Sequence, residues 1–494
     1  MLTYDLDRTH PVSLYDQLYR CIRTDIESGA LRPGERLPSK RALARHLGVS
    51  LITVQGALAQ LVAEGYVDAQ ERRGCFVAFI ERSTRAPRQP APPCAQAASH
   101  ATPPAPVRPP MHAEPPALAD LTGASTPGGL FPYHAWASIV RKVLAEGSED
   151  ALIGAGEPQG SPLLREAIAK HVRGFRGLDV EPGRIVVGAG AQVLYQLIVQ
   201  LLGPRMRVAV EDPGYPRLQR TYEAMGAQTQ PIPVIGEAAS LEWLAALEAD
   251  AIHCMPSHHF PTGATISAPA RHRLLEWAHA AEGRYLVEDD YDCEFRMQGK
   301  PIAPLCALDD EKVIYLNTYT KSLGGAFRIG YMVLPAHLAH AFRERLGFYS
   351  CTVGGIDQAA LRRFIATGAY ERHCNRLRTH YRRVSRALAL GLKGCAEGVR
   401  LRHVGAGLHF AMKVNGMQDE EQEGAFLRGL EARGVRMNPL RAYRYEGCPR
   451  MACELAGTFL VSFGGVEEEC VARIVRAVGE ALEGARGGAP YSGS

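Results

Sequence analysis

Val313-Ile314-Tyr315-Leu316-Asn317-Thr318-Tyr319-Thr320-Lys321 is the stretch that decides the fold of this chain. Its apolar start predicts a buried strand, and its hydroxyl-rich end is followed by Arg328 and a second apolar run, 331–334. Hydroxyl groups and a cation are what a phosphate needs, and an amine beside a phosphate can condense with an aldehyde. A lysine is more often a solvated surface charge, so the rest of the chain decides between the two interpretations.

Short apolar runs alternate with helical stretches around this segment. Four of these runs predict further strands, at 184–187, 207–210, 251–255 and 285–289. Strands that alternate with helices form a mostly parallel sheet with helices on both faces, which is the α/β class. Sites in such sheets lie at the carboxyl ends of the strands, and the motifs described next fall at such ends.

Two predicted strand ends carry candidate binding groups. Gly188 to Gln192 opens a helix, where free backbone N–H groups suit a phosphate, although an ordinary strand-to-helix turn looks the same. Asp289 and Tyr291 follow another strand, where a carboxylate can hold a protonated ring nitrogen and a phenol can bond a ring oxygen. The alternatives for this acidic segment are a solvated loop or a metal site. We predict no metal, because no histidine is placed to join the carboxylates.

Composition limits the class of protein. The 494 residues are 46% apolar and 22% charged, with a net charge of +4, as in soluble globular proteins of two or three domains. The twelve cysteines include no Cys-x-x-Cys pair, which fits a reduced cytosol and argues against zinc ribbons. No signal-peptide pattern follows Met1, and no apolar run reaches the length of a membrane span, so we expect a cytoplasmic protein.

A change of composition divides the chain. Residues 81–118 are rich in Pro and Ala and have no periodicity, which predicts a semi-extended linker without a core. The alternative is a loop within one domain, but loops of this length are uncommon in compact domains. We therefore expect one unit at residues 1–80 and a second at residues 119–494.

The first unit has the pattern of a winged helix-turn-helix. An apolar stripe predicts a helix over 14–28, and Ser39 can cap a second helix that ends at Gly48. Ser50 can cap a third helix that runs to residue 64. A strand from Val67 and the turn 72–74 predict a two-stranded wing. The residues of the third helix expected to face the core are Val54, Leu58, Leu61 and Val62.

These residues resemble the winged-helix domain of the GntR family of transcription factors. The resemblance rests on Leu-Pro-Ser-x-Arg-x-Leu-Ala from Leu37, Leu-Gly-Val-Ser-x-x-Thr-Val from Leu47 and Glu-Gly-Tyr from Glu64, and it covers about residues 12–78. It implies double-stranded DNA as the partner. Arginines on this face argue against a winged helix that serves protein contacts alone. The residues implied in DNA binding are Arg36, Ser39, Arg41, Ser50, Thr53, Gln55, Arg72 and Arg73.

One of these positions leaves the preferred DNA sequence open. Many family members hold arginine where this chain has Gln55. Arginine reads guanine, whereas glutamine reads adenine. The same resemblance leaves open whether two copies would read direct or inverted half-sites.

The second unit resembles the fold-type I aminotransferases, and the whole chain resembles the MocR subfamily, which joins a GntR winged helix to such a domain. The resemblance implies the α/β fold described above, with a small C-terminal α+β subdomain. It also implies a homodimer, with a head-to-tail arrangement in MocR relatives. The motifs that carry it are 131–132, 156–160, 164–168, 211–215, 256–258, 261–263, 288–292 and the block from Lys321 to Gly330.

The resemblance implies pyridoxal 5′-phosphate as cofactor. Lys321 would form its internal aldimine, and Asp289 would pair with the pyridine nitrogen and keep it protonated. Tyr291 would contact the ring hydroxyl, and Tyr215 would stack on the ring. The phosphate would be held by Gly190, Ala191, Gln192, Thr318, Thr320 and Arg328.

An effector carboxylate would bind arginine. The resemblance places Arg217 for this role. The substrate-binding arginine near the C-terminus of the aminotransferases is Leu460 here, and Arg441 or Arg444 is the candidate to replace it.

Two further residues depart from the pattern of working aminotransferases. The asparagine that tunes the ring oxygen is Phe260, and the tyrosine that reaches the neighbouring subunit is Ala155. A binding site tolerates such losses better than a catalyst that must move protons. We therefore predict a regulator in which an amine or amino acid replaces Lys321 as the aldimine partner. The alternatives are an active aminotransferase with an added DNA-binding domain, and a sensor of the cofactor itself.

Overall fold

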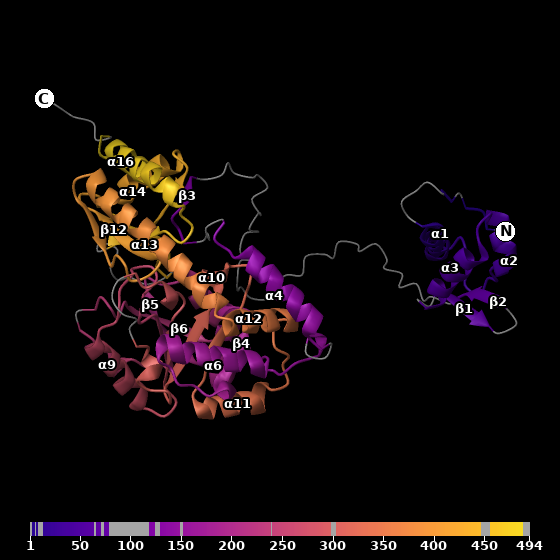
Figure 1. Ribbon diagram of the computed structural model, residues 1–494, viewed down its shortest axis with the longest axis horizontal. Helices are drawn as coiled ribbons and strands as arrows, with labels where there is room; N and C mark the ends of the chain where they lie inside the picture. Colours follow the sequence, from indigo (N-terminus) through magenta and orange to yellow (C-terminus); the bar gives the residue numbers. More distant parts are fainter. Residues whose placement is uncertain are drawn as a thin grey trace, which may run out of the picture. The chain divides into compact units, whose positions relative to one another are not determined.

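The computed structural model describes residues 2–4, 6–7, 13–63, 66–70, 74–78, 118–123, 129–148, 152–238, 240–297, 303–445 and 455–487. The chain divides into two compact units, Met1–Arg108 and Pro109–Ser494, which are coloured along the sequence in Figure 1. Arg72, Arg73 and the predicted linker up to residue 117 lie outside the described residues. The role of the two arginines and the linker therefore stay predictions.

The described part of the first unit combines helices with a two-stranded antiparallel sheet. The strands pair from Val67 opposite Val77 to Gln70 opposite Gly74. The elements are α1 (Leu14–Ser28), α2 (Lys40–Leu47), α3 (Leu51–Ala63), β1 (Val67–Gln70) and β2 (Gly74–Val77).

Local capping explains where these helices begin and end. The Ser39 hydroxyl accepts a hydrogen bond from the Ala42 N–H at 3.2 Å, and Gly48 ends α2 in the left-handed region. The Ser50 hydroxyl accepts one from the Thr53 N–H at 3.0 Å, at the start of α3. The predicted bounds of α1 and α2 are confirmed.

One core prediction for α3 is wrong. Val54, Leu58 and Leu61 are buried as expected, but the Val62 side chain is 36% exposed. One residue advances about 100° around an α-helix, which takes Val62 away from the buried stripe. Ile52, at the start of the same helix, is 79% exposed.

The second unit is built on a mixed seven-stranded sheet in the order β4-β10-β9-β8-β7-β5-β6. Neighbouring strands from β9 to β6 are parallel, and β10 is antiparallel to both β4 and β9. The predicted α/β class with a mostly parallel sheet is confirmed. The strands are β4 (Ile185–Gly188), β5 (Arg207–Asp212), β6 (Gln228–Pro233), β7 (Ala251–Cys254), β8 (Tyr285–Asp289), β9 (Val313–Thr318) and β10 (Gly330–Val333).

Alternate residues of these strands enter different cores because side chains in a strand point to opposite faces. In β9, Val313 and Tyr315 join one core, and Ile314 and Leu316 join the other. The first core is covered by α4 (Tyr133–Glu146), α6 (Pro162–Arg176), α9 (Ala268–His279) and α12 (Gly355–Ala366). The second is covered by α7 (Ala191–Leu202), α8 (Pro216–Ala224) and α11 (Ala336–Leu346).

A smaller C-terminal layer has its own core, as predicted. Its four-stranded antiparallel sheet has the order β11-β12-β15-β14, and helices α13, α14 and α16 pack beside it (Figure 1). The elements are β11 (Val399–Arg402), β12 (His409–Val414), β14 (Asn438–Pro439), β15 (Thr458–Ser462), α13 (Ala369–Cys395), α14 (Glu420–Glu431) and α16 (Val471–Gly487).

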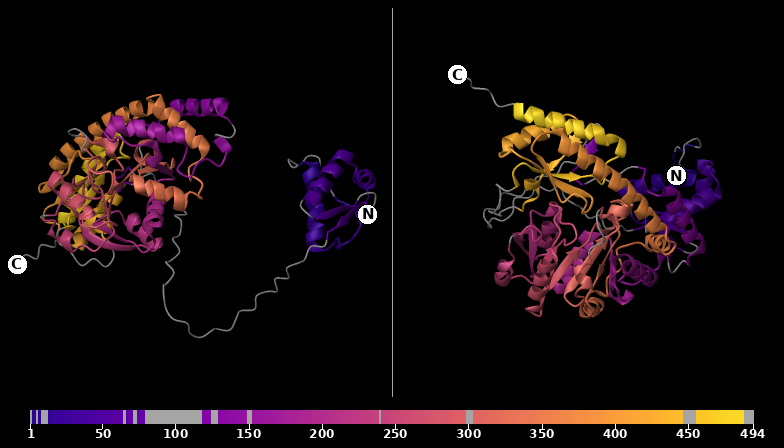
Figure 2. Two further views of the ribbon diagram at one scale, coloured as in Figure 1. Left: turned by 90° about the horizontal axis from the view of Figure 1, so that it is seen from below. Right: turned by 60° about the vertical axis from the view of Figure 1, so that its left-hand side comes forward.

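The segment 118–123 joins this smaller layer. Strand β3 (Ala119–Asp120) pairs in parallel with β13 (Val435–Arg436), and the Leu121 carbonyl accepts a hydrogen bond from the Ser462 N–H at 3.0 Å. The long helix α13 runs beside both the larger and the smaller layer (Figure 2). Among the described residues, no helix is both long and apolar enough to cross a lipid bilayer.

Candidate functional site

Lys321 lies just beyond the end of β9. Strand β9 ends at Thr318, Tyr319 begins a single helical turn, α10 (Thr320–Leu323), and Lys321 lies within it. The half-buried Lys321 Nζ donates a hydrogen bond to the Gly123 carbonyl at 3.4 Å. Burial lowers the pKa of the Lys321 amine, while the nearby Asp292 carboxylate raises it. An amine with a lowered pKa is unprotonated more often and is a better nucleophile.

Asp289 ends β8 as a buried carboxylate with one oxygen in use. Asp289 Oδ2 accepts a hydrogen bond from Tyr195 Oη at 2.5 Å, and His253 Nε2 lies 3.6 Å from the same oxygen. Asp289 Oδ1 finds no hydrogen-bond partner within the described part of the chain. A buried carboxylate oxygen is costly to leave unpaired. The geometry therefore fits a cationic N–H donor from a bound group, such as a protonated pyridine ring.

The sheet brings the predicted phosphate residues to one edge. Gly330 of β10 lies opposite Gly188 on one side and Thr318 on the other. The turns that follow β4 and β9 are therefore neighbours. These turns carry Gly190, Ala191 and Gln192 on one side, and Thr318 and Thr320 on the other.

Arg328 completes this edge. Its guanidinium donates to the Ala189 carbonyl at 3.3 Å, and a Cβ added to Gly190 would lie 2.8 Å from Arg328 Nη2. Gly190 has a φ of +86°, and Arg328 itself has a φ of +45°, which is strained for a residue with a side chain. The close approach needs glycine at 190, and it places a cation beside the free N–H groups that begin α7.

Aromatic rings surround the lysine side of the site. Tyr291 Oη donates to the His258 carbonyl at 3.2 Å, and burial raises the pKa of the Tyr291 phenol, with Asp292 adding to the effect. The ring of Phe260 lies edge-on to Tyr215 at 5.9 Å, to His409 at 5.4 Å and to Tyr443 at 5.1 Å between centroids. Such rings suit the flat apolar faces of a bound aromatic ring.

The acidic segment at the end of β8 is not a solvated loop. Its carboxylates, Glu288, Asp289, Asp290 and Asp292, are all buried. The reason given for excluding a metal was also wrong, because the side-chain ligand atoms of His258, Asp292 and His409 lie within 4.8 Å of one another. His258 Nδ1 and Asp292 Oδ2 are 2.8 Å apart, so these two groups already satisfy each other by a hydrogen bond. That no metal binds stays a prediction.

The two candidate effector arginines differ in their surroundings. Arg217 on α8 is exposed and lines a hollow of about 420 Å³ together with Gln192 and Arg220. Arg441 lies in η5 (Leu440–Tyr443), and its guanidinium pairs with the Glu420 and Glu423 carboxylates. The structure thus brings Arg217 to the phosphate side of the site and engages Arg441 with two acids.

Some residues of the site come from elements in which no sequence motif predicts a functional role. Tyr195 comes from α7 and His253 from β7, and both meet Asp289. Tyr222 Oη lies 2.9 Å from His253 Nδ1 and extends the network. The only sequence signal was indirect, since Tyr195 follows the glycine turn by about one helical turn.

The DNA-binding candidates of the first unit lie at its surface. Arg36, Arg41 and Gln55 are exposed. Ser39 and Ser50 cap their helices, and Ser50 Oγ also lies 2.8 Å from Thr53 Oγ1. Arg36 lies against the wing, because a Cβ on Gly74 would be 3.4 Å from Arg36 Nε. Exposed arginines and polar side chains are the groups that contact a DNA backbone, and the DNA-binding role of these particular residues stays a prediction.

Two family models match the chain. Residues 14–77 match the bacterial regulatory proteins of the gntR family, and residues 129–458 match aminotransferase class I and II. A structural neighbour of the second unit is the multiple substrate aminotransferase of Thermococcus profundus, with a TM-score of 0.65 and 23% identity over 76% of this chain and 93% of its own. These matches define a DNA-binding transcriptional regulator with an aminotransferase fold.

Relatives of the same two-part organisation span nearly the whole chain. The uncharacterized HTH-type transcriptional regulator YhdI of Bacillus subtilis is 33% identical over 95% of each chain. The pyridoxine biosynthesis regulator PdxR of Corynebacterium glutamicum is 30% identical over 89% of this chain and 90% of its own. The probable rhizopine catabolism regulator MocR of Rhizobium meliloti is 29% identical over 91% of each. This chain belongs to the MocR subfamily of GntR-type transcriptional regulators.

Proposed function

We propose that this regulator holds pyridoxal 5′-phosphate on Lys321 and responds to a primary amine or amino acid. The observation that carries the proposal is the buried Asp289 Oδ1, which lacks a partner among the described residues and suits a pyridinium N–H. The cofactor supplies an aldehyde for the lysine and an electron-withdrawing ring. Tyr291 and Tyr215 serve the ring, and the turns after β4 and β9 serve its phosphate together with Arg328.

The response is an exchange of amines at one carbon. The cofactor would supply an aldehyde carbon that binds one amine at a time, so an effector amine would compete there with Lys321 Nζ, which would be released as a free amine. The lowered pKa of Lys321 favours this exchange, since the neutral amine can both attack and leave. Arg217, exposed in the hollow beside Gln192, is the residue we assign to an effector carboxylate.

Three positions favour a sensor over an enzyme. Phe260 is packed among aromatic rings where aminotransferases place asparagine. Leu460 is fully buried in β15 where they place arginine, and Arg441 is already paired with two acids. A third departure is Ala155, which is exposed. These losses weaken proton movement and substrate orientation more than they weaken binding.

Absorbance spectroscopy tests the cofactor, the lysine and the effector together. The purified protein with added cofactor should show the band of the lysine-bound form, and titration with amines and amino acids should shift it. Steady release of a keto acid over many turnovers would instead establish the alternative, an active aminotransferase with a DNA-binding domain.

The cofactor itself is a second candidate signal. The Corynebacterium glutamicum relative is named a pyridoxine biosynthesis regulator, and the site described above is suited to that cofactor. DNA affinity measured with and without pyridoxal 5′-phosphate, in the absence of amines, separates the two. A response to the cofactor alone supports this second candidate, and a response that needs an amine supports the first.

We also propose that the regulator acts as a homodimer in the cytoplasm, where its DNA lies. Large apolar side chains are exposed near the start of the second unit, with Tyr133 at 69%, Leu144 at 55%, Ile153 at 69% and Leu163 at 54%. Contiguous exposed apolar groups mark protein interfaces, and these four residues are our candidates for such a surface. Sedimentation velocity tests the proposal, which fails if the protein stays a monomer at micromolar concentration.

A further inference from the structure

Helix α13 carries an unusual density of positive charge. Between Ala369 and Cys395 it contains seven basic residues, six of them arginine, and Glu371 as its single acid. Its apolar side is buried against the rest of the unit, with Leu377, Tyr381 and Leu388 at 3% exposure or less. The helix is therefore held by its apolar side, and the charge has to face outward.

The exposed arginines form a line. Arg372, Arg376, Arg383 and Arg386, all exposed, fall within about 80° of one another around the helix axis at 100° per residue. We call these four residues the arginine stripe. At 1.5 Å per residue it is about 21 Å long, which matches about six base-pair steps of 3.4 Å along one DNA strand. Arg382 is exposed beside it.

Little within the described residues neutralises the stripe. Arg383 Nη1 lies 3.9 Å from Glu468 Oε2, and both side chains are at least half exposed, so this pair is weak. Arg372 donates to the Thr367 carbonyl, which carries no net charge. In the described ranges, Arg376 and Arg386 have no carboxylate within ion-pair distance.

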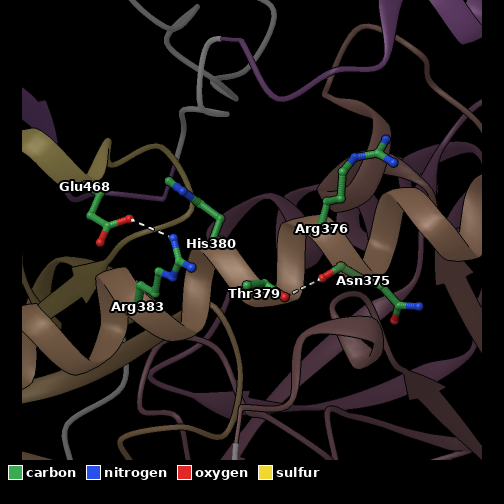
Figure 3. Close-up of a pocket in the computed structure, with 6 residues that line it drawn as sticks. All are labelled: Asn375, Arg376, Thr379, His380, Arg383 and Glu468. Carbon is green, nitrogen blue, oxygen red and sulfur yellow. Dashed lines mark hydrogen bonds and ion pairs between the residues drawn. The ribbon is translucent and has the colours of Figure 1, made fainter.

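A hollow beside the stripe is lined by hydrogen-bond donors. It measures about 380 Å³, and it is lined by Asn375, Arg376, Thr379, His380, Arg383 and one acid, Glu468. Figure 3 shows Arg376 extending outward from α13, and Glu468 meeting Arg383 at the other end. The guanidinium groups and the Asn375 amide are donors that can bind a phosphate, whereas the Thr379 hydroxyl already donates to the Asn375 carbonyl.

We propose that the arginine stripe is a second DNA-contacting surface, which binds the phosphate backbone of the duplex that the winged helix recognises. The inference rests on DNA binding by the first unit and assigns a further contact to the second. Once the winged helix holds a duplex, a surface on the same chain meets that duplex at a high effective concentration. The stripe adds affinity without reading sequence, because phosphate contacts position a protein but do not specify bases.

The chemistry favours DNA over other anionic partners. A membrane surface would need apolar groups between the charges, and the exposed apolar residue in line with the stripe is Leu390 alone on this helix. An acidic protein segment would also match the charge. The length of the arginine line suits a run of duplex phosphates, and DNA is the polyanion that this family binds.

Salt dependence of DNA binding tests the proposal on the full chain. The probe is a 60-base-pair duplex of mixed sequence. Its binding to the parent chain is compared with its binding to a variant that carries Arg372→Gln, Arg376→Gln, Arg383→Gln and Arg386→Gln together. We expect affinity at 0.1 M salt to fall about 10- to 100-fold, and the slope of log K against log salt to shrink by about 3. The control removes four exposed arginines from other helices, namely Arg273, Arg345, Arg473 and Arg476, and should change the slope by less than about 1.

The variant Glu468→Gln should change DNA affinity in the opposite direction. It removes the acid next to Arg383, so DNA affinity should rise about two- to fivefold, which keeps the test informative if the fourfold variant folds poorly. Equal slopes for the stripe and control variants overturn the proposal while leaving the winged-helix function intact. Polyglutamate serves as a second probe, in place of an acidic protein segment. If the stripe variant loses binding to polyglutamate but binds DNA as the parent does, the proposal is wrong and an acidic protein partner is favoured. Failure of the parent chain to bind any duplex overturns both this inference and the proposed function.

Discussion

The predicted DNA-binding face and the predicted cofactor site at Lys321 are built in opposite ways. The first consists of exposed side chains on neighbouring short elements, from Arg36 to Gln55, held by local helix caps. The second gathers buried groups from Gly123 to His409 onto one edge of a sheet. A local, exposed site loses affinity in small independent steps, whereas buried groups that share partners act as a unit. The predictions below test this contrast.

Lys321→Ala should have the largest effect. The amine that joins the cofactor is removed, so the absorbance band of the lysine-bound form should vanish completely and amines should no longer change DNA affinity. Binding of DNA without effector should stay within about twofold, because the winged helix keeps its own core. Lys312→Ala, a change at a partly exposed lysine whose Nζ donates to two carbonyls outside the site, serves as the control. A lysine-bound spectrum that survives in Lys321→Ala would refute the assignment of the anchor.

Asp289→Asn should weaken cofactor retention about 10- to 100-fold. A hydrogen bond between charged groups contributes about 1.5–3 kcal/mol, and asparagine keeps the shape but loses the charge. Equilibrium dialysis against the cofactor measures the effect. Asp310→Asn, at a carboxylate that is 56% exposed, is the matched control. Equal affinities for Asp289→Asn and the parent would show that the unpaired oxygen faces no cationic group.

Arg41→Gln should reduce DNA affinity about tenfold and lower the salt slope by about 1, as expected for one lost phosphate contact. Fluorescence anisotropy with a labelled duplex measures both, and cofactor binding should not change. Arg20→Gln removes an exposed arginine that pairs with Asp16 on α1, and it should leave the slope unaltered. A changed cofactor spectrum in the Arg41→Gln variant would show that the two sites are not independent.

Ser39→Ala should have the smallest effect. It removes the hydroxyl that accepts from the Ala42 N–H, which costs about 1 kcal/mol of folding free energy. Thermal unfolding should show a lower midpoint temperature for the first unit and an unchanged midpoint temperature for the second. Ser28→Ala, at the far end of α1, is the control. A shift in both transitions would mean that the units do not unfold independently.

Local rules predicted the first unit well. Ser39 and Gly48 bound α2 because a cap needs only its own neighbours along the chain. The exposure of Val62 was not predicted, because the periodicity of apolar residues does not show where the buried side of a helix ends. In the second unit, Asp289 and Lys321 follow apolar strands, and the parallel sheet confirmed that these strand ends share an edge.

Contacts between elements that are distant along the chain could not be predicted from the sequence. Tyr195 and His253 meet Asp289 from a helix and another strand, and nothing in their spacing marks that meeting. His258 reaches Asp292 in the same way, which is why the acidic segment looked free of histidine. Arg441 looked available until Glu420 and Glu423 were placed beside it. Such contacts depend on the order of strands in space rather than along the chain.

The hydrogen bond from Lys321 Nζ to the Gly123 carbonyl links chemistry to topology. Gly123 closely follows strand β3, which pairs with β13, and the Leu121 carbonyl between them accepts a hydrogen bond from Ser462 of β15. The Lys321 amine is thus bonded to a segment that belongs to the smaller layer. Any group that takes up Lys321 Nζ must therefore break a contact between the larger and the smaller layer of the second unit.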